Sequence, residues 1–546
     1  MTTAAPGKTA GIAGAEVLVA GQALDGRIAP LLQELRVEDN LTLPDTFLIR
    51  FSDPGLKHVD SHPFEVGAEV EIRLASPQSN TVTSLIKGQV TAVEPEFRAD
   101  GITIVARGYD QSHALNRTRH TATYQDVTVA DVVEKVSQRA GFTSTRIEVP
   151  GGGTLPFVQQ SNETDWEFLW RLAGRVGCEV MVLDKELVFR PAGGDSGATP
   201  VELKYGETLT QFRPRLTGVQ QVEEVIVRGW DHTTKRAIEA RAKPEKPRSE
   251  IGVGREKVAT ALGGGTITIS DAPVGDQAEA DALAKSVMAR VANSYLEAEG
   301  TCRGAPGLRA GGSIKVGGVG TRFSGTYRIT STVHAFRGGA GYETRFRVSG
   351  DSSRSLVELM TPSTRPGWES GGVQIAVVTQ NEDPDGMGRV RVRYPELGEE
   401  TEGWWARTTG PGAGRDKGLM MLPEVGDEVL VAFEHGDVRR PMVLGALWNG
   451  EDTPGDLVQT DGSFRLRAAE TIGLKADKKM TVTADEELTI EVGSATAVLK
   501  KDGSITVKGA KVSIEADGSL TIKAGSSLSL QASGTVQVKG AQVQLG

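Results

Sequence analysis

The sequence has too few cysteines for a disulfide framework and no apolar run long enough for a membrane span. It holds two cysteines in 546 residues, Cys178 and Cys302, and we expect both to be reduced, packed thiols. The N-terminus lacks the apolar core of a signal peptide, and no stretch approaches the roughly 18 apolar residues of a membrane helix. We therefore expect synthesis and assembly in the cytoplasm, without a Sec-type signal.

Aromatic residues and net positive charge are also scarce. Aromatics make up 5% of the chain, and 71 acidic against 61 basic residues give a formal net charge of −10. A protein built mainly to bind nucleic acid would show a net basic face, so we expect no nucleic-acid partner. Glycine, in contrast, reaches 67 residues without a Gly-X-Y period, which excludes collagen and suits a mainly β protein with many tight turns.

Changes in residue pattern divide the chain into five predicted parts. They are a flexible N-terminal arm, a base, a linker, a compact β domain and a repetitive tail, at residues 1–15, 16–350, 351–372, 373–455 and 456–546. Alternation in the base predicts strands at 46–51, 69–74, 86–93 and 102–107. Capping residues and apolar stripes predict helices that begin at Thr128 and Thr164, and a third over about 276–296.

The tail from Gly455 to Gly546 lacks Pro, Cys, His, Trp and Tyr, and an apolar pair at positions i and i+2 recurs along it. The first members of successive pairs are 7 or 8 residues apart, except for one irregular step of 17. An i, i+2 pair lies on one face of a strand, and a turn every eight residues describes a β-helix or solenoid. The predicted inward-facing residues are Ile472, Leu474, Met480, Val482, Leu488, Ile490, Ile505, Val507, Val512, Ile514, Leu520, Ile522, Leu528, Leu530, Val536, Val538, Val543 and Leu545.

Two or three aliphatic side chains in eight residues cannot close a core within one chain. Three chains wound around a common axis would bury the apolar face and leave no exposed sheet edge. We therefore expect an intertwined trimeric β-helix; the rivals are a single-chain β-helix and, further behind, an ordinary sandwich. A rigid prism with a polar coat has few loops that could carry a pocket, so a mechanical role fits the tail better than catalysis.

Four ordered phrases precede the tail. They read DGMGRVRVRYP (385–395), WWAR (404–407), LPEVGDEVLVAF (422–433) and EHGDVRRPMVLGALWN (434–449). In this order they closely resemble the OB-fold domain of the VgrG and phage baseplate spike family. The resemblance assigns the OB-fold motif to Gly388, Arg389, Val390, Trp405, Arg407, Gly426, Asp427, Glu428, Gly436, Asp437, Pro441, Gly445 and Asn449.

The base resembles the same family at DWEFLWRL (165–172) and PGLRAGGSIKV (306–316). The resemblance implies a mainly β chain with tandem tube-like β-barrels and a few helices, an OB-fold barrel and an intertwined trimeric needle. It implies a homotrimeric spike at the tip of a contractile injection machine, either a type VI secretion system, a contractile phage tail or a phage-tail-like particle that is released or fired into a target. The implied partners are a hexameric inner-tube protein, baseplate proteins, a PAAR-type tip protein at the C-terminal end, effector cargo and the target cell envelope.

The sequence offers no catalytic, cofactor-binding or metal-ligating set. His58 and His62 are four residues apart, but prolines bracket them, which predicts a loop rather than a ligating helix. Residues 383–386 lack the further ligands of a Ca²⁺ loop and are predicted to be a turn. The segment 450–463 is too short for the lysozyme domain that some family members insert there. We expect a non-enzymatic spike; the alternatives are a trimeric β-helical adhesin and a polysaccharide-active enzyme or cell-wall hydrolase with paired carboxylates.

Overall fold

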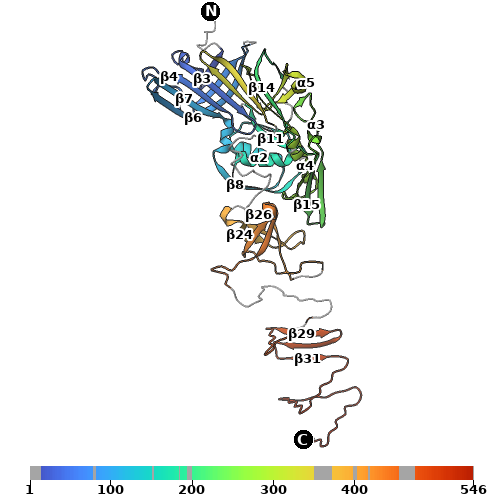
Figure 1. The fold of residues 1–546 in the computed structure, drawn as a ribbon. Coiled ribbons are helices and arrows are strands. Elements are labelled where there is room, and N and C mark those ends of the chain that lie inside the picture. Colours follow the sequence, from blue (N-terminus) through green and yellow to red (C-terminus); the bar gives the residue numbers. More distant parts are fainter. Residues whose placement is uncertain are drawn as a thin grey trace, which may run out of the picture. The chain divides into compact units, whose positions relative to one another are not determined.

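A computed structural model describes residues 14–77, 81–150, 153–183, 185–193, 199–219, 221–349, 372–397, 402–415, 419–453, 472 and 474–544. The chain forms two compact units, Met1–Pro454 and Gly455–Gly546. Strands predominate over helices, as predicted (Figure 1). Most of the predicted arm, the linker up to residue 371 and the needle residue Leu545 lie outside the described residues. No helix in the described ranges is both long and apolar enough to cross a membrane.

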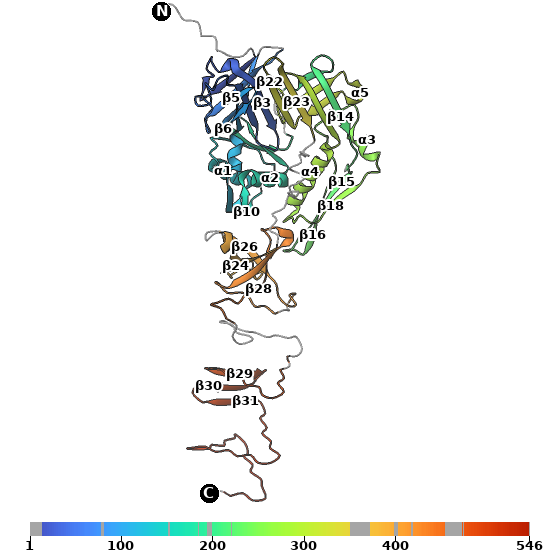
Figure 2. The same ribbon diagram turned by 60° about the vertical axis from the view of Figure 1, so that its left-hand side comes forward.

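One sheet of eleven strands runs through the base (Figure 2), in the order β14-β19-β23-β22-β3-β4-β7-β6-β5-β1-β2. Its strands are β1 (Ala15–Val19), β2 (Gln22–Ala23), β3 (Leu32–Asn40), β4 (Thr46–Ser52), β5 (Glu69–Ala75), β6 (Val82–Arg98), β7 (Gly101–Asp110), β14 (Leu209–Leu216), β19 (Leu296–Arg303), β22 (Ser331–Arg337) and β23 (Gly341–Val348). Strands from the two ends of the base meet at β3 and β22, which run antiparallel with Asn40 opposite Ser331. The early and late parts of the base are therefore hydrogen-bonded into one sheet.

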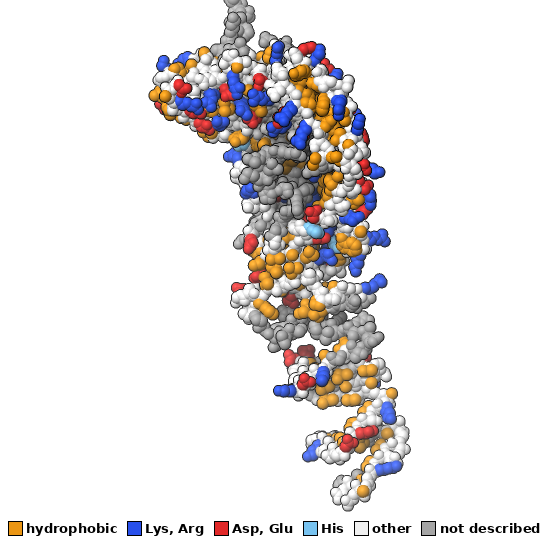
Figure 3. All heavy atoms as spheres, viewed as in Figure 1, with side chains coloured by type: hydrophobic (Ala, Val, Ile, Leu, Met, Phe, Trp, Pro, Cys, Tyr) orange, Lys and Arg blue, Asp and Glu red, His pale blue; other side chains and the backbone are white. Residues whose placement is uncertain are grey.

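The sheet has one apolar and one charged face, because its strands alternate. On β3, Leu35 and Val37 are buried, whereas Arg36 between them lies on the other face. That other face carries acidic and basic side chains in cross-strand pairs, such as Arg347 with Glu299 at 3.0 Å. Figure 3 shows both signs of charge interspersed over this part of the molecule.

Smaller sheets and the helices complete the base. The smaller sheets contain β8 (Arg119–Val127) with β10 (Leu155–Thr164); β9 (Ser144–Ile147), β11 (Cys178–Leu183) and β12 (Glu186–Pro191); β13 (Val201–Lys204), β17 (Glu250–Ile251), β20 (Ser313–Gly317) and β21 (Gly325–Arg328); and β15 (Glu224–Asp231), β16 (Arg236–Ala242) and β18 (Thr266–Ile269). The helices are η1 (Ala29–Leu31), η2 (Gln111–Asn116), α1 (Val129–Arg139), α2 (Asp165–Val176), α3 (Arg255–Thr260), α4 (Gln277–Asn293) and α5 (Gly320–Phe323).

The helices start where their capping residues predict. Thr128 and Thr164 each form a reciprocal capping box with the acidic residue three positions on, which satisfies backbone N–H groups of the first turn. The third helix, α4, ends at Asn293, so the predicted end at 296 is wrong. Burial alternates strictly from Leu296 onward, which makes that residue the start of β19 rather than the end of a helix. Cys178 and Cys302 are both free and buried, as predicted.

Residues 373–446 contain a closed five-stranded barrel in the order β24-β25-β26-β28-β27. The barrel consists of β24 (Val373–Gln380), β25 (Arg389–Arg393), β26 (Glu402–Thr408), β27 (Glu428–Phe433) and β28 (Pro441–Ala446), with the short helices η3 (Pro395–Leu397) and η4 (Glu434–Gly436). Its core is aliphatic: Val390, Val392 and Val429 are each 0% exposed. Closure lets a short stretch of chain bury its own apolar residues without leaving a sheet edge.

The C-terminal unit contains an antiparallel meander of three strands, β29 (Glu487–Val492), β30 (Ala495–Lys500) and β31 (Ile505–Lys508). Gly493 and Gly503 occupy the connecting turns with left-handed φ values of 57° and 83°, which favour glycine. Elsewhere in this unit the described residues show bends at regular intervals and no strand paired within the chain.

Candidate functional site

Most aliphatic side chains of the C-terminal unit are exposed. The exposed fraction runs from 40% at Leu499 to 76% at Val492, and Figure 3 shows hydrophobic side chains at the surface of this unit. An apolar surface of this extent is typical of an interaction face. The exposed residues include the predicted inward-facing Ile472, Leu474, Met480, Val482, Ile490, Ile505, Val507, Val512, Ile514, Leu520, Ile522, Leu528, Leu530, Val536, Val538 and Val543, whereas Leu488 is half-buried.

The backbone of this unit turns with a period of eight residues, including across the irregular step of the apolar pairs. Turns or bends lie at 477–478, 485–486, 493–494, 501–503, 510, 517–518, 525–526, 533–534 and 541–542. The step of 17 residues holds β30, where Leu499 pairs with Leu488 and Ala497 pairs with Ile490. The sequence reasoning missed the pair Ala497 and Leu499 because alanine gives a weak apolar signal.

Six of these side chains share one face of the meander, because residues that pair across antiparallel strands point to the same side. We call this the aliphatic face, and it consists of Leu488, Ile490, Ala497, Leu499, Ile505 and Val507. Four of its side chains are 40–70% exposed, namely Ile490, Leu499, Ile505 and Val507. The single chain therefore leaves open an apolar face that another chain could cover.

In the barrel, the motif residues Arg389 and Val390 begin β25, and Gly388 directly precedes it. Gly388 has a left-handed φ of 69°, and Val390 points into the core. The Arg389 guanidinium forms an ion pair with Asp383 at 2.7 Å and lies 5.7 Å over the ring of Trp405. This guanidinium, by hydrogen bonding, holds the pKa of the Asp383 carboxyl well below its usual range. Residues 383–386 form a turn, as predicted, and the Asp383 carboxylate also accepts backbone N–H groups there.

The motif residues Gly426, Asp427 and Glu428 form the turn into β27. Gly426 has a φ of 104°, and Asp427 Oδ2 accepts the backbone N–H of Glu424 at 2.8 Å. Asn449 donates from Nδ2 to the Glu428 carboxylate at 3.3 Å. These residues therefore shape and brace turns of the barrel. Of the remaining motif residues, Arg407 is exposed opposite Arg389, and Gly445 pairs with Leu430.

The last motif residues, Gly436, Asp437 and Pro441, frame a loop that contacts the base. Gly436 has a φ of 79°, and Pro441 begins β28. The Asp437 carboxylate is buried and accepts hydrogen bonds from the side chain of Arg439, with an Nη2–Oδ2 distance of 2.7 Å. Arg439 thereby points out of the barrel toward the helices of the base.

Arg439 completes a buried network of four charged side chains, which we call the junction network. It consists of Arg175 on α2, Glu279 on α4, and Asp437 and Arg439 on the barrel loop. Arg439 Nη1 lies 2.9 Å from Glu279 Oε1, and the same carboxylate accepts a hydrogen bond from Arg175. The Glu279 carboxylate also accepts the backbone N–H of Gly275 at 2.6 Å. Side-chain exposure is at most 19% for any of the four.

The electrostatics of the junction network favour the ionised carboxylate. Burial acts to raise the pKa of Glu279, but the guanidiniums of Arg439 and Arg175 outweigh it and lower the pKa to about 2. Burial and the nearby Arg439 lower the pKa of Arg175. Burial also acts to lower the pKa of Arg439, but the nearby carboxylates of Asp437 and Glu279 outweigh burial and raise that pKa. Two cations and two anions balance within the network.

Arg440 gives the loop a second contact with the base. It pairs with Glu434 at 2.9 Å and donates to the backbone carbonyls of Trp230 and Val274. The sequence reasoning assigned Asp437 and Pro441 but missed Arg439 and Arg440 between them. Two adjacent arginines in a loop are a signal that could have been followed, but their partners on the base, Glu279, Trp230 and Val274, lie more than 150 residues away.

The other side of the barrel contacts the β8–β10 sheet. The rings of Phe157 and Trp404 stack with centroids 6.1 Å apart, and Arg391 donates to the Gln125 side chain at 2.6 Å. The barrel thus contacts two separate parts of the base, the β8–β10 sheet on one side and α4 with β15 on the other.

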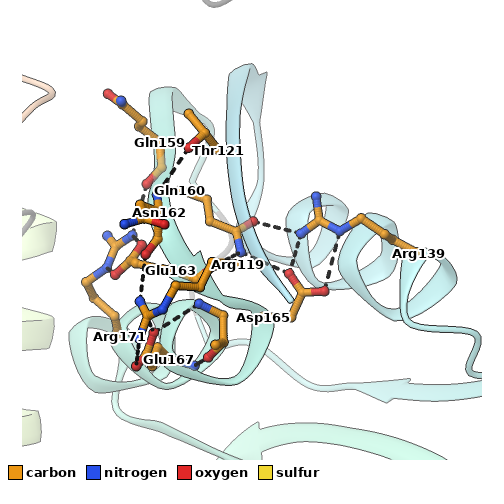
Figure 4. Close-up of polar contacts among 11 residues, drawn as sticks. Arg119, Thr121, Arg139, Gln159, Gln160, Asn162, Glu163, Asp165, Glu167 and Arg171 are labelled. Carbon is orange, nitrogen blue, oxygen red and sulfur yellow. Dashed lines mark hydrogen bonds and ion pairs between the residues drawn. The ribbon is translucent and has the colours of Figure 1, made fainter. Parts of the chain in front are cut away.

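The β8–β10 sheet is held to α1 and α2 by a polar network (Figure 4). Arg139 on α1 donates to Gln160 at 2.7 Å and pairs with Asp165, the first residue of α2. Arg119 on β8 donates to the backbone carbonyl of Asn162 at 2.6 Å, in the bulge of β10 where Asn162 has a φ of 48°. These bonds hold the β8–β10 sheet, which the barrel contacts, in place against α1 and α2.

The predicted loop histidines lie where expected. His58 and His62 are half-buried between β4 and β5, and His62 Nδ1 accepts the backbone N–H of Phe64 at 3.2 Å. Within the described ranges, no group of three or more His, Cys, Asp or Glu is placed to hold a metal ion.

Two family models match the chain. Residues 374–448 match the type VI secretion system/phage-baseplate injector OB domain, and residues 50–337, more than half of the chain, match the Alg8 N-terminal domain. The chain is 36% identical over 109 residues to the "Probable baseplate hub protein" of Escherichia phage P2. It is 30% identical over 141 residues to the type VI secretion system spike protein VgrG1b of Pseudomonas aeruginosa. These matches cover 20% and 23% of this chain but only 28% and 18% of the two relatives.

A solved structure resembles the fold over most of its length. It is an E. coli component of the type VI secretion system, described as structurally similar to the T4 bacteriophage tail proteins gp27 and gp5. The TM-score is 0.51 at 17% sequence identity, and the match covers 79% of this chain and 99% of that one. The likeness shows that this chain shares the fold of that protein over most of its length.

Proposed function

The chain belongs to the phage baseplate hub and VgrG spike family, with an Alg8 N-terminal domain at residues 50–337, and we propose that three copies form the spike of a contractile injection system. In this role the base joins the inner tube and the baseplate, and the C-terminal units wind into a needle that pierces the target envelope. The work is mechanical, and the spike performs no catalytic step of its own.

The exposed aliphatic side chains of the C-terminal unit carry this proposal. Full burial of a Val, Leu or Ile side chain contributes about 1.5–3 kcal/mol. Half of that, summed over the sixteen exposed residues named above, is about 12–24 kcal/mol, which reaches or exceeds the upper end of the roughly 5–15 kcal/mol that stabilises a whole domain. A unit with this much to gain from burial is expected to be assembled with other copies whenever it is folded.

The repeat pattern of the chain suits an assembly of three copies, which would bury these apolar side chains. The turns recur every eight residues and the apolar pairs occupy one face of each segment, so three such faces can meet around an axis. Each segment then pairs with a neighbouring chain, which also provides strand partners for the described segments that have none within the single chain. The polar residues between the pairs form the outer surface.

The mass of the purified protein in solution tests the trimer. Light scattering is expected to give three times the chain mass of 57.9 kDa at all concentrations that can be measured. A stable species of one chain mass would mean that the repeats close on themselves. The single-chain solenoid, with an adhesive or enzymatic role, would then replace the spike.

The proposed partners follow from the spike role. They are a hexameric inner-tube protein and baseplate proteins at the base, a PAAR-type tip protein at the C-terminal end, effector cargo and the target cell envelope. Assembly takes place in the cytoplasm, and the spike leaves the cell only as part of a particle that is released or fired. Co-purification of tube and baseplate proteins with the tagged chain tests this. Binding of the free protein to cell surfaces without any tube partner would instead support an adhesin.

A further inference from the structure

The junction network joins three elements that are far apart in the sequence. Glu279 is its centre, because its carboxylate accepts the backbone N–H of Gly275, just before its own helix, and contacts the guanidiniums of Arg175 on α2 and Arg439 on the barrel. The helices α2 and α4 also touch directly, since Ser286 donates to the carbonyl of Gly174 at 2.9 Å. One carboxylate thus connects two helices of the base to the barrel.

The pairing within the network shows what kind of contact this is. Each side is neutral by itself, with Arg175 and Glu279 on the base and Asp437 and Arg439 on the barrel. A buried ion network adds little net stability compared with an apolar contact of the same size, because each charge is desolvated. It tolerates few geometries, however, and loss of one member leaves a buried charge without compensation. Such a contact sets the orientation of the barrel on the base and adds little to the free energy that holds the two together.

The surrounding contacts restrict the barrel further. Arg440 donates to two backbone carbonyls of the base, at Trp230 and Val274, which do not move without their chain segments. On the opposite side, the ring of Trp404 stacks on Phe157. Contacts on two sides resist both tilting and rotation of the barrel.

We infer that the loop Asp437–Arg440 is a docking element whose partner is the α2–α4 pair of the base, and that it holds the barrel in one orientation so that thrust on the base reaches the needle. The thrust-bearing part of this inference rests on the proposed spike function, whereas the docking does not. It assigns Arg175, Glu279 and Arg439 a role in mechanical coupling.

Amide hydrogen exchange of the full-length protein tests the docking. In Glu279→Gln, exchange at residues 274–280 and 434–441 is expected to be about tenfold faster than in wild type, because a buried guanidinium loses its counter-charge. The matched control is Glu239→Gln, which removes an exposed carboxylate that pairs with Arg228 and Arg241 on the β15–β16 hairpin, and it should exchange as wild type does. Unchanged exchange in Glu279→Gln would overturn the inference.

If Glu279→Gln does not fold, Arg439→Lys provides a second test of the docking. Lysine retains the charge but cannot bind Asp437 and Glu279 at once with a planar fork, so faster exchange is again expected at both segments. The interior strands β25 and β27 should remain protected in this variant, because their core contacts do not include the loop. Loss of protection throughout the barrel would mean that Arg439 serves barrel folding rather than docking, and would overturn the inference.

Particles that carry the variants test the thrust. Spikes with Glu279→Gln are expected to be incorporated at the wild-type level but to deliver cargo about tenfold less often, in line with the looser joint. Delivery at the wild-type rate, despite faster exchange, would overturn the mechanical part. Failure of the wild-type chain itself to enter particles would overturn the proposed function, and the exchange result would still decide the docking.

Discussion

The barrel and the C-terminal unit use the same aliphatic alternation with opposite outcomes. Val390, Val392 and Val429 are fully buried in the barrel, whereas Val482 and Val538 in the C-terminal unit are 65% and 64% exposed. The difference is closure, because five strands of the barrel wrap around their own core and the meander β29–β31 stays open. Alternation therefore fixes which face is apolar, and topology decides whether one chain can bury it.

Ile514→Lys should have the largest effect on the difference between the two regions, because we expect complete loss of the trimer. The substitution would bring three ammonium groups together near one axis, without counter-charges. Light scattering should then report single chains in place of trimers. The matched control is Ser513→Lys, one residue earlier and on the opposite side of the segment, which should leave the mass unchanged. Trimers of Ile514→Lys would show that this side chain does not face other chains.

Acid should loosen the contact between the base and the barrel as the pH falls from about 4.5 toward about 2. The pKa of Glu279 is about 2 in the fold against an ordinary 4.5, so its contribution of about 3 kcal/mol is present above pH 4.5 and lost as the pH falls toward 2. Tryptophan fluorescence follows this process selectively, because residues 455–546 contain no tryptophan. The variant Glu279→Gln should show a flatter acid profile in this window. An identical profile would assign the acid sensitivity to other carboxyl groups.

Val429→Ala should lower the stability of the barrel by about 2 kcal/mol without changing the number of chains. The removed methyl groups leave a cavity in a core that the chain fills alone. The matched variant is Val538→Ala in the C-terminal unit, where the loss should appear as easier dissociation of the trimer. Thermal melting at several protein concentrations separates the two, since only the second should depend on concentration. Concentration dependence in Val429→Ala would contradict the self-contained core.

Ala497→Val should give the smallest effect, a gain of up to about 1 kcal/mol in trimer stability. Valine has a higher preference for strands and would enlarge the weakest apolar pair of the aliphatic face. Denaturant titration of trimer dissociation measures the gain. A loss would mean that the three faces are already tightly packed at this level.

Much of the local structure could be predicted from the sequence. The capping boxes at Thr128 and Thr164 mark their helices because the donors and acceptors lie three residues apart. The strand at 86–93 was found but extends over 82–98 as β6, because the polar residues of a solvated hairpin end carry no clear alternation. Alternation similarly identified the apolar pairs, but not their alanine-containing member at Ala497.

Contacts between distant segments could not be predicted. Nothing near Glu279 in the sequence indicates that Arg175 and Arg439 will meet it, since both are more than 100 residues away. The same holds for β3 and β22, whose pairing depends on the folding of everything between them. Local physical signals determine elements and faces, whereas the site at the junction arises from packing that only the complete fold provides.

The pairing of β3 with β22 has a consequence for biosynthesis. Asn40 leaves the ribosome about 290 residues before its partner Ser331, which at roughly 5–20 residues per second is an interval of about 15–60 s. During this time β3 presents an unpaired, half-apolar edge, a template for pairing with other nascent chains. Because contacts of such sequence separation also slow folding, the base should be the step at which this polypeptide depends on chaperones and at which overexpression yields aggregates.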